Sequence, residues 1–196
     1  MKNLERFQCI YGTDITERYF KHCLEIDKQV YPKIYQGNFA LCSAWFEKNP
    51  FIYTLIIDTT TDTAVGYINA MPITTMLHDM IMKGQSMDTE ISPDHHLLSY
   101  ENDTAYHLYL CSLAVAPEYQ KTIVFPLLFN TFLGNLHQLA ERGIQIKQMI
   151  AEAVSKEGIS FCERNQFEKV METENHTVLY RLDAPLATLK PIHITK

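Results

Sequence analysis

The stretch LAVAPEYQKTIVFPLL, residues 113–128, has the form of a turn that could bind a phosphate. Its first residues predict a strand that Pro117 ends, and the residues from Val124 onward predict an apolar helix. The backbone N–H groups of such a turn, together with the amino end of the helix, can hold an anion. Lys121 and Thr122 would add a positive charge and a hydroxyl group that suit a phosphate.

Bulky residues stand where such a turn usually has small ones. Glycine is needed there only if the backbone takes a positive φ or if a β-carbon would touch the phosphate. If the turn holds right-handed helical angles, Ile123 and Phe125 can donate their N–H groups while their side chains point away. In the alternative interpretation, Ile123, Val124 and Phe125 are core residues that fill a lost pocket. The sequence leaves both interpretations open.

Three further side chains are of types that could move a proton. Cys162, on a predicted helix, carries a thiol whose reference pKa is about 8.5. The alternative is that Cys162 is a small core residue. His107 and Tyr109 alternate onto one face of a predicted strand and are candidate bases. A neutral phenol is a poor base, so Tyr109 also fits a packed strand aromatic.

The elements that must position these residues follow from hydrophobic periodicity. Helices are predicted over 14–30, 39–48, 74–83, 124–142 and 155–165. Strands are predicted over 6–11, 51–58, 64–73, 105–116 and 144–154, with a last hairpin over 167–182 that turns near Glu174 and Asn175. Asp14, Ser155 and Gly143 are the expected caps of three of the helices.

The order of these elements predicts the fold class. The strand–helix–strand unit over 105–154 implies a parallel crossover, and the hairpins on either side imply antiparallel strands. We therefore expect an α/β (α+β) fold with a mixed, mostly antiparallel central sheet flanked by helices. A single domain is expected over 1–184, followed by a tail over 185–196.

Composition narrows the partners and the compartment. A formal net charge of −6 argues against nucleic acid as the main partner. No apolar run is long enough for a signal peptide or a membrane span, so no membrane partner is expected. The five cysteines predict reduced thiols in a cytoplasmic protein. No Cys/His spacing is typical of a zinc site, so no metal is expected.

Two local patterns and the order of the elements together resemble the GCN5-related N-acetyltransferase (GNAT) family, over about residues 6 to 182. The first pattern is a strand end and turn of the form L-x-V-x-P-x-x-R/Q-x-x-G-x-G/A. Its matching positions here are Leu113, Val115, Pro117 and Gln120. Ile123 and Phe125 replace the two glycines, and Lys121 stands where a further glycine is common.

The second pattern resembles N-x-x-A-x-x-F-Y-x-x-x-G-F and falls on SKEGISFCERNQF, residues 155–167. The apolar anchors Phe161 and Phe167 are kept. Ser155 replaces the asparagine and Cys162 the tyrosine. These departures fall on positions that touch ligands in the family.

The resemblance implies an enzyme that moves an acetyl group from acetyl-CoA to a primary amine by direct attack, without a metal. In many relatives a tyrosine at the position of Cys162 protonates the departing thiolate, and some carry a carboxylate base near Tyr109. The strand near Leu113–Val115 would supply an oxyanion donor. The cosubstrate-binding residues carried over from the resemblance are Leu113, Val115, Gln120, Lys121, Thr122, Ile123, Val124, Phe125 and Ser155.

The alternative function is a non-catalytic binding or regulatory module that keeps the fold and has filled or weakened its coenzyme A slot. The sequence does not distinguish between a small-molecule amine and a peptide amine as the acceptor. Residues 79–103 carry six acidic side chains against one basic, which favours a cationic amine; a solvated acidic loop is the alternative. Exposed sheet edges are compatible with a homodimer.

Overall fold

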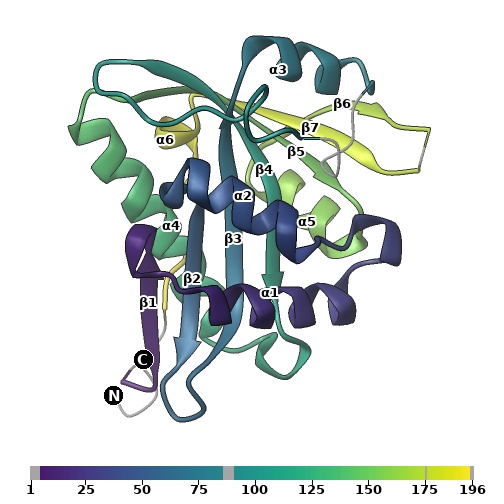
Figure 1. Cartoon of the computed structure of the whole chain (residues 1–196). Coiled ribbons are helices and arrows are strands. Elements are labelled where there is room, and N and C mark those ends of the chain that lie inside the picture. Colours follow the sequence, from purple (N-terminus) through teal and green to yellow (C-terminus); the bar gives the residue numbers. More distant parts are fainter. Residues whose placement is uncertain (1–4, 86–90, 175, 195–196) are drawn as a thin grey trace. The chain divides into compact units, whose positions relative to one another are not determined.

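The structure of the chain, a computed structural model, describes residues 5–85, 91–174 and 176–194. Its strands are β1 (Phe7–Tyr11), β2 (Tyr53–Asp58), β3 (Thr63–Ile73), β4 (Ala105–Val115), β5 (Gln145–Ala153), β6 (Glu168–Glu172) and β7 (Val178–Asp183). Its α-helices are α1 (Glu17–Val30), α2 (Phe39–Lys48), α3 (Thr75–Met82), α4 (Val124–Glu141), α5 (Lys156–Arg164) and α6 (Pro185–Thr188). Figure 1 labels these elements along the chain.

The strands form a seven-stranded sheet in the order β1-β2-β3-β4-β5-β7-β6. β4 and β5 pair in parallel, whereas the pairs β1–β2, β2–β3, β5–β7 and β6–β7 are antiparallel. The mixed, mostly antiparallel sheet flanked by helices that the sequence predicts is therefore confirmed. The parallel pair requires the long crossover through α4, because parallel neighbours cannot be joined by a tight turn.

The chain packs into two compact units. The first unit comprises Met1–Asn69, Ser112–Gly134 and Pro191–Lys196, and the second comprises Ala70–Cys111 and Asn135–Lys190. The division of the chain into a domain over 1–184 and a tail stays a prediction.

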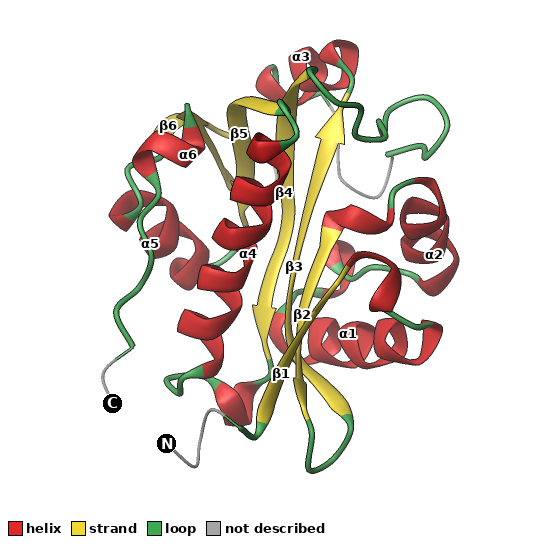
Figure 2. Cartoon of the chain, turned by 90° about the vertical axis from the view of Figure 1, so that its left-hand side faces the viewer, coloured by secondary structure: helices red, strands yellow, loops and turns green. Residues whose placement is uncertain are grey.

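In the first unit, helices cover both faces of the strands. Figure 2 shows α1 and α2 on one face of β1, β2 and the start of β3, and the first part of α4 on the opposite face. α1 buries Phe20, Cys23 and Ile26 at helical spacing, which is why this stretch folds as a helix against the sheet. β2 is buried along its whole length, as expected for a strand covered on both faces.

In the second unit, α5 and α6 both contact β5. The core of this unit includes Leu108 of β4 and Met149 and Ile150 of β5, all fully buried. β6 is the outer strand and is mostly exposed, and its turn into β7 closes through a bond from Thr173 N to the carbonyl of Thr177. The predicted hairpin is confirmed, while Asn175 lies outside the described residues.

Two of the predicted caps are confirmed and one is wrong. The Ser155 hydroxyl accepts from Gly158 N at 3.1 Å at the start of α5. Gly143 follows α4 with a φ of +76°. Asp14, however, ends a short 3₁₀ helix, and α1 begins only at Glu17. Ile15, which lies in the chain between the 3₁₀ helix and α1, is buried, so the chain must turn inward before α1 can start.

The segment expected to be a tail contains the short helix α6. Within the first unit, the backbone of Ile192 makes two hydrogen bonds with the side chain of Asn130 on α4. Ile192 N donates to Asn130 Oδ1 at 2.7 Å, and Asn130 Nδ2 donates to the Ile192 carbonyl at 2.9 Å. This pair of bonds fixes the segment near Ile192 on the surface of α4.

Candidate functional site

The turn between β4 and α4 keeps the framework that the sequence predicts. β4 ends at Val115, and Pro117 opens a short 3₁₀ helix. Ala116 N donates to the carbonyl of Val65 on β3 at 2.9 Å. The side chain of Gln120 donates from Nε2 to the Val115 carbonyl at 3.2 Å. Gln120 therefore closes the turn onto the strand that precedes it.

Lys121 adopts a left-handed conformation with a φ of +61°. This backbone shape normally favours glycine and costs a side-chain-bearing residue about 1 kcal/mol. The turn thus keeps the conformation of a glycine-containing turn at the position where the GNAT pattern often has one. Right-handed angles throughout 121–125, the simplest way to accommodate bulky residues, are not what the chain adopts. Lys121 and Thr122 are both exposed.

The hydroxyl of Thr122 makes two hydrogen bonds at the turn that precedes α4. It donates to the carbonyl of Tyr119 at 2.5 Å and accepts from Val124 N at 3.2 Å. One backbone donor of the first helical turn is therefore already bound within the chain. Pro126 has no N–H, and its place in the first helical turn is the one that helices tolerate. The first bond of the α-helical ladder is from Leu127 N to the Ile123 carbonyl, at 3.0 Å.

The three apolar residues of the turn differ in burial. Val124 is fully buried and packs at Gly66 of β3, where an added β-carbon would lie 3.3 Å from Val124 Cγ1. Ile123 and Phe125 are only partly buried. The Phe125 ring stacks on the ring of Phe129 one turn along α4, with centroids 6.2 Å apart. Val124 is a core residue, as one interpretation expected, whereas Ile123 and Phe125 remain partly open to solvent.

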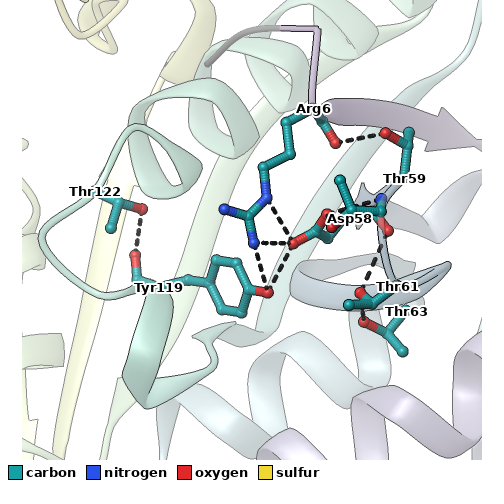
Figure 3. A network of polar contacts seen from close by, with 8 residues as sticks. Arg6, Asp58, Thr59, Thr61, Thr63, Tyr119 and Thr122 are labelled. Atoms are coloured by element: carbon teal, nitrogen blue, oxygen red, sulfur yellow. Dashed lines mark hydrogen bonds and ion pairs between the residues drawn. The ribbon is translucent and has the colours of Figure 1, made fainter. Parts of the chain in front are cut away.

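A buried carboxylate ties the turn to the end of β2 (Figure 3). Asp58 is fully buried, and its Oδ2 accepts from Arg6 Nε at 2.9 Å and from the Tyr119 hydroxyl at 2.8 Å. Oδ1 accepts from the Thr60 hydroxyl at 2.7 Å. The bond from Arg6 is the main cause that lowers the pKa of Asp58, so the carboxylate is ionised. Burial and the adjacent carboxylate raise the pKa of Tyr119, which keeps the phenol protonated as the donor.

The edge of β4 just before the turn is occupied by a side chain from the end of α1. The hydroxyl of Tyr31 donates to the Leu113 carbonyl at 3.0 Å and accepts from Leu113 N at 3.2 Å. Both backbone groups of Leu113, the first residue of the stretch expected to supply an oxyanion donor, are therefore bound to one phenol.

The end of α1 is fixed to β3 by a buried carboxylate. The Asp27 carboxylate accepts from the Tyr67 hydroxyl and, at 3.3 Å, from Gly37 N. Asp27 and Tyr67 are only 4% and 3% exposed. Burial raises the pKa of Asp27, because an ionised carboxylate loses solvation in the core.

In the second unit, His107 belongs to a row of polar side chains that continues through His78 and Gln148 to Asp183. Its ring packs on the ring of His78 from α3, with centroids 4.2 Å apart. His78 Nε2 bonds to Gln148 Oε1 at 2.6 Å, and Gln148 Nε2 donates to Asp183 at 2.7 Å. Burial, followed by the charge of His78, lowers the pKa of His107, so its imidazole is neutral near pH 7. Nδ1 of His107 is buried and has no hydrogen-bond partner among the described residues.

The other proton-transfer candidates of the second unit are buried. Tyr109 is 3% exposed and Cys162 is 2% exposed. Burial raises the pKa of the Cys162 thiol to about 12, which leaves the thiol protonated at neutral pH. Burial of this degree is what a packing residue would show. Ser155 uses its hydroxyl as the cap of α5.

The structure groups the predicted site residues by unit. Within the first unit lie Leu113, Val115, Gln120, Lys121, Thr122, Ile123, Val124 and Phe125. Within the second lie His107, Tyr109, Ser155 and Cys162. Sequence reasoning missed Tyr31, Asp58 and Tyr119, because no local pattern marks a hydroxyl or carboxylate whose partner lies 61 or 82 residues away.

The acidic segment is described in part. Asp79, Asp94, Glu101 and Asp103 are within the described residues, whereas Asp88 and Glu90 are outside them. No helix of the described residues is long and apolar enough to cross a membrane.

No protein-family model matches this sequence, and no curated protein matches it. Solved structures do resemble it. The loading GNATL domain of CurA from Lyngbya majuscula is 12% identical with a TM-score of 0.64, over 91% of this chain and 98% of that one. Ard1 from Thermoplasma volcanium is 11% identical with a TM-score of 0.59, over 91% and 98%. Arabidopsis thaliana NAA60, solved with acetyl-CoA, is 12% identical with a TM-score of 0.57, over 90% and 99%.

At these identities the likeness concerns the fold alone, and it extends over nearly the whole of each chain. Together with the mixed sheet and its parallel β4–β5 pair, it shows that this chain has the fold of the GCN5-related N-acetyltransferases.

Proposed function

We propose that this protein is an acetyltransferase that moves an acetyl group from acetyl-CoA to a primary amine. The fold supports this proposal, and NAA60, which shares the fold, was solved with acetyl-CoA. The observation that carries it is the left-handed backbone at Lys121 in the turn between β4 and α4. A strained conformation at a residue with a side chain is kept only where the surrounding structure imposes it, and such strain concentrates at ligand-binding sites.

The turn fits the pyrophosphate of the cosubstrate in three respects. Lys121 and Thr122 are exposed, so a charge and a hydroxyl are accessible. The turn lies at the amino end of an 18-residue helix, where the helix dipole favours an anion. Tyr119 is tied to Asp58 at 2.8 Å, which holds the turn in place before any ligand arrives.

When bound, acetyl-CoA supplies a thioester that the amine attacks directly. A carbon–nitrogen bond forms, the carbon–sulfur bond breaks, the ammonium loses a proton and the thiolate gains one. We propose His107 as the proton acceptor, because its lowered pKa keeps it neutral. Tyr109 is the weaker candidate, since a buried neutral phenol is a poor base. We propose Cys162 as the proton donor because of its position in the resemblance; its thiol is protonated at neutral pH, but its raised pKa makes it a weaker acid than an exposed thiol.

The acceptor is proposed to be a cationic amine, either a small molecule or a peptide. The described acidic residues of the segment before β4 support this choice, since negative potential concentrates cations. Acetylation of a polyamine should then exceed that of a neutral amine, and its advantage should fall at high salt. A preference for neutral amines would reject the charge selection while leaving the transferase proposal intact.

A non-catalytic binding module is the second candidate, and two contacts favour it. Thr122 occupies Val124 N, and Tyr31 occupies the backbone of Leu113. A chain that has lost its ligand could fill these positions with its own hydroxyl groups.

Thermal unfolding with coenzyme A and acetyl-CoA tests whether the protein binds the cosubstrate at all, as both the transferase and the binding module would. Ligand at about a hundred times its dissociation constant should stabilise the fold by about 2.7 kcal/mol. Release of coenzyme A in the presence of amines then distinguishes a transferase from a module that only binds. Stabilisation without any turnover over a broad panel of amines would favour the binding module, and no stabilisation would reject the proposed site.

A further inference from the structure

We propose that the hydroxyl of Tyr31 holds the place of amide groups of the cosubstrate on the edge of β4, and that binding displaces it. This inference rests on the proposed function. It assigns to Tyr31 the control of affinity for a ligand whose chain carries amides, such as the pantetheine arm of coenzyme A. Tyr31 is thus a gating residue for the arm, distinct from the residues that would hold the pyrophosphate.

The edge of β4 at Leu113 faces away from β3. Ala116 N donates to Val65 on β3, and backbone groups alternate between the two sides of a strand, so Leu113 points its N–H and C=O to the other side. On that side, the pairs of β4 with β5 run only from Ala105 to Leu110. Leu113 therefore lies beyond the paired part of β4, at a strand edge that can accept an extended chain.

The two bonds of Tyr31 match one acceptor and one donor of an arm that carries successive amides. A phenol has a single proton, and here it is given to the Leu113 carbonyl while the oxygen accepts from Leu113 N. The N–H and C=O of one trans amide point in opposite directions, so one amide cannot make both bonds. An extended arm with two successive amides can turn a C=O of one and an N–H of the other toward Leu113 and so replace both bonds. The phenol cannot donate to a ligand while its proton is held by Leu113. A ligand arm that pairs with Leu113 must therefore displace the hydroxyl.

The backbone N–H and carbonyl of Tyr31 are both hydrogen-bonded within the chain. Tyr31 N donates to the Asp27 carbonyl at 2.8 Å at the end of α1. The carboxylate of Asp27 is in turn bound by the buried Tyr67 hydroxyl and by Gly37 N. The carbonyl of Tyr31 accepts from Gln36 Nε2 at 2.9 Å, so both backbone groups of Tyr31 are bound and the side chain is the part that must move to expose Leu113.

The substitution Tyr31→Phe tests this gate, since it removes the competing hydroxyl and keeps the ring. Coenzyme A should bind to the variant about twofold to tenfold more tightly than to the wild-type chain, the range that corresponds to one net hydrogen bond. Adenosine 3′,5′-bisphosphate, which lacks the amide arm, should bind equally to both. Tyr19→Phe is the matched control, because the Tyr19 hydroxyl bonds to the exposed side chain of Asp62, and it should leave both affinities unchanged.

Hydrogen exchange at the Leu113 amide gives a second readout. In the free protein it should be faster in Tyr31→Phe than in wild type, and coenzyme A should slow it in both. Equal or weaker binding of coenzyme A by Tyr31→Phe overturns the gate while leaving the proposed function in place. The gate is also overturned if Tyr31→Phe binds adenosine 3′,5′-bisphosphate more tightly than wild type to the same extent as coenzyme A. Failure of both proteins to bind coenzyme A overturns the gate and the proposed site together.

Discussion

The hydroxyl of Tyr119 donates to the carboxylate of Asp58 at 2.8 Å, and this bond joins the turn before α4 to the buried end of β2. The two residues are 61 positions apart in the chain. The turn that we propose as the phosphate site is thus held by a charge-assisted bond rather than by local sequence alone. Arg6 completes the network from the segment that precedes β1 (Figure 3).

Removing that bond should loosen the turn. Tyr119→Phe should lower the free energy of unfolding by about 1.5 kcal/mol, because a hydrogen bond to an ionised group is lost. It should also weaken the binding of coenzyme A, since the turn is no longer fixed before the ligand arrives. Chemical denaturation and calorimetric titration measure the two effects. Tyr19→Phe, which removes an exposed bond to Asp62, is the control and should change neither. Unchanged affinity in a destabilised Tyr119→Phe would show that the tie does not position the site.

Asp58 should make stability depend on pH in the acidic range. Its pKa is lowered in the folded state, mainly by Arg6, below the unfolded value of about 3.9. Its stabilising contribution is therefore full above about pH 4 and is lost as the pH falls toward the folded pKa. Denaturation of wild type and Asp58→Asn from neutral to acidic pH tests this. The wild-type advantage should shrink below about pH 4; an advantage that stays constant would contradict the ion pair.

Replacing Lys121 by glycine should stabilise the fold and weaken the binding of coenzyme A. Lys121→Gly should raise the free energy of unfolding by up to about 1 kcal/mol, because relief of the left-handed strain is partly offset by the greater freedom of glycine in the unfolded chain. The same change removes a positive charge and should weaken coenzyme A binding most strongly at low salt. Lys121→Asn removes the charge while keeping a residue that tolerates a positive φ. If both variants bind as tightly as wild type at low salt, the lysine does not contact the phosphates.

Cys162 should affect turnover without affecting binding. If it donates the proton to the thiolate, Cys162→Ala should lower kcat and leave the Kd for coenzyme A unchanged. Because the thiol is 2% exposed, the variant should also lose about 1 kcal/mol of stability through the cavity it leaves. Cys162→Ser restores a proton donor of similar size and should recover part of the turnover. Equal turnover in all three proteins would assign the thiol to packing alone.

Local signals in the sequence were enough for the strands, for helices α1 to α5 and for their order, but not for the short helix α6. The β-formers before Pro117, the apolar spacing of α4 and the Ser155 cap each act over a few residues, so the sequence predicts them directly. The mixed sheet followed from that order, because a long crossover permits a parallel pair and short turns do not.

Only the tertiary structure decided how the site is held. The left-handed backbone at Lys121 could not be read from a lysine, because side-chain-bearing residues avoid a positive φ unless the surrounding fold imposes it. α1 begins at Glu17 and not at Asp14 as the sequence predicted, because Ile15 is buried in the core. The bond of Tyr31 to Leu113 spans 82 positions, and packing places its two ends together. Local propensity acts within a turn or a strand, whereas these features depend on which distant segments the sheet brings into contact.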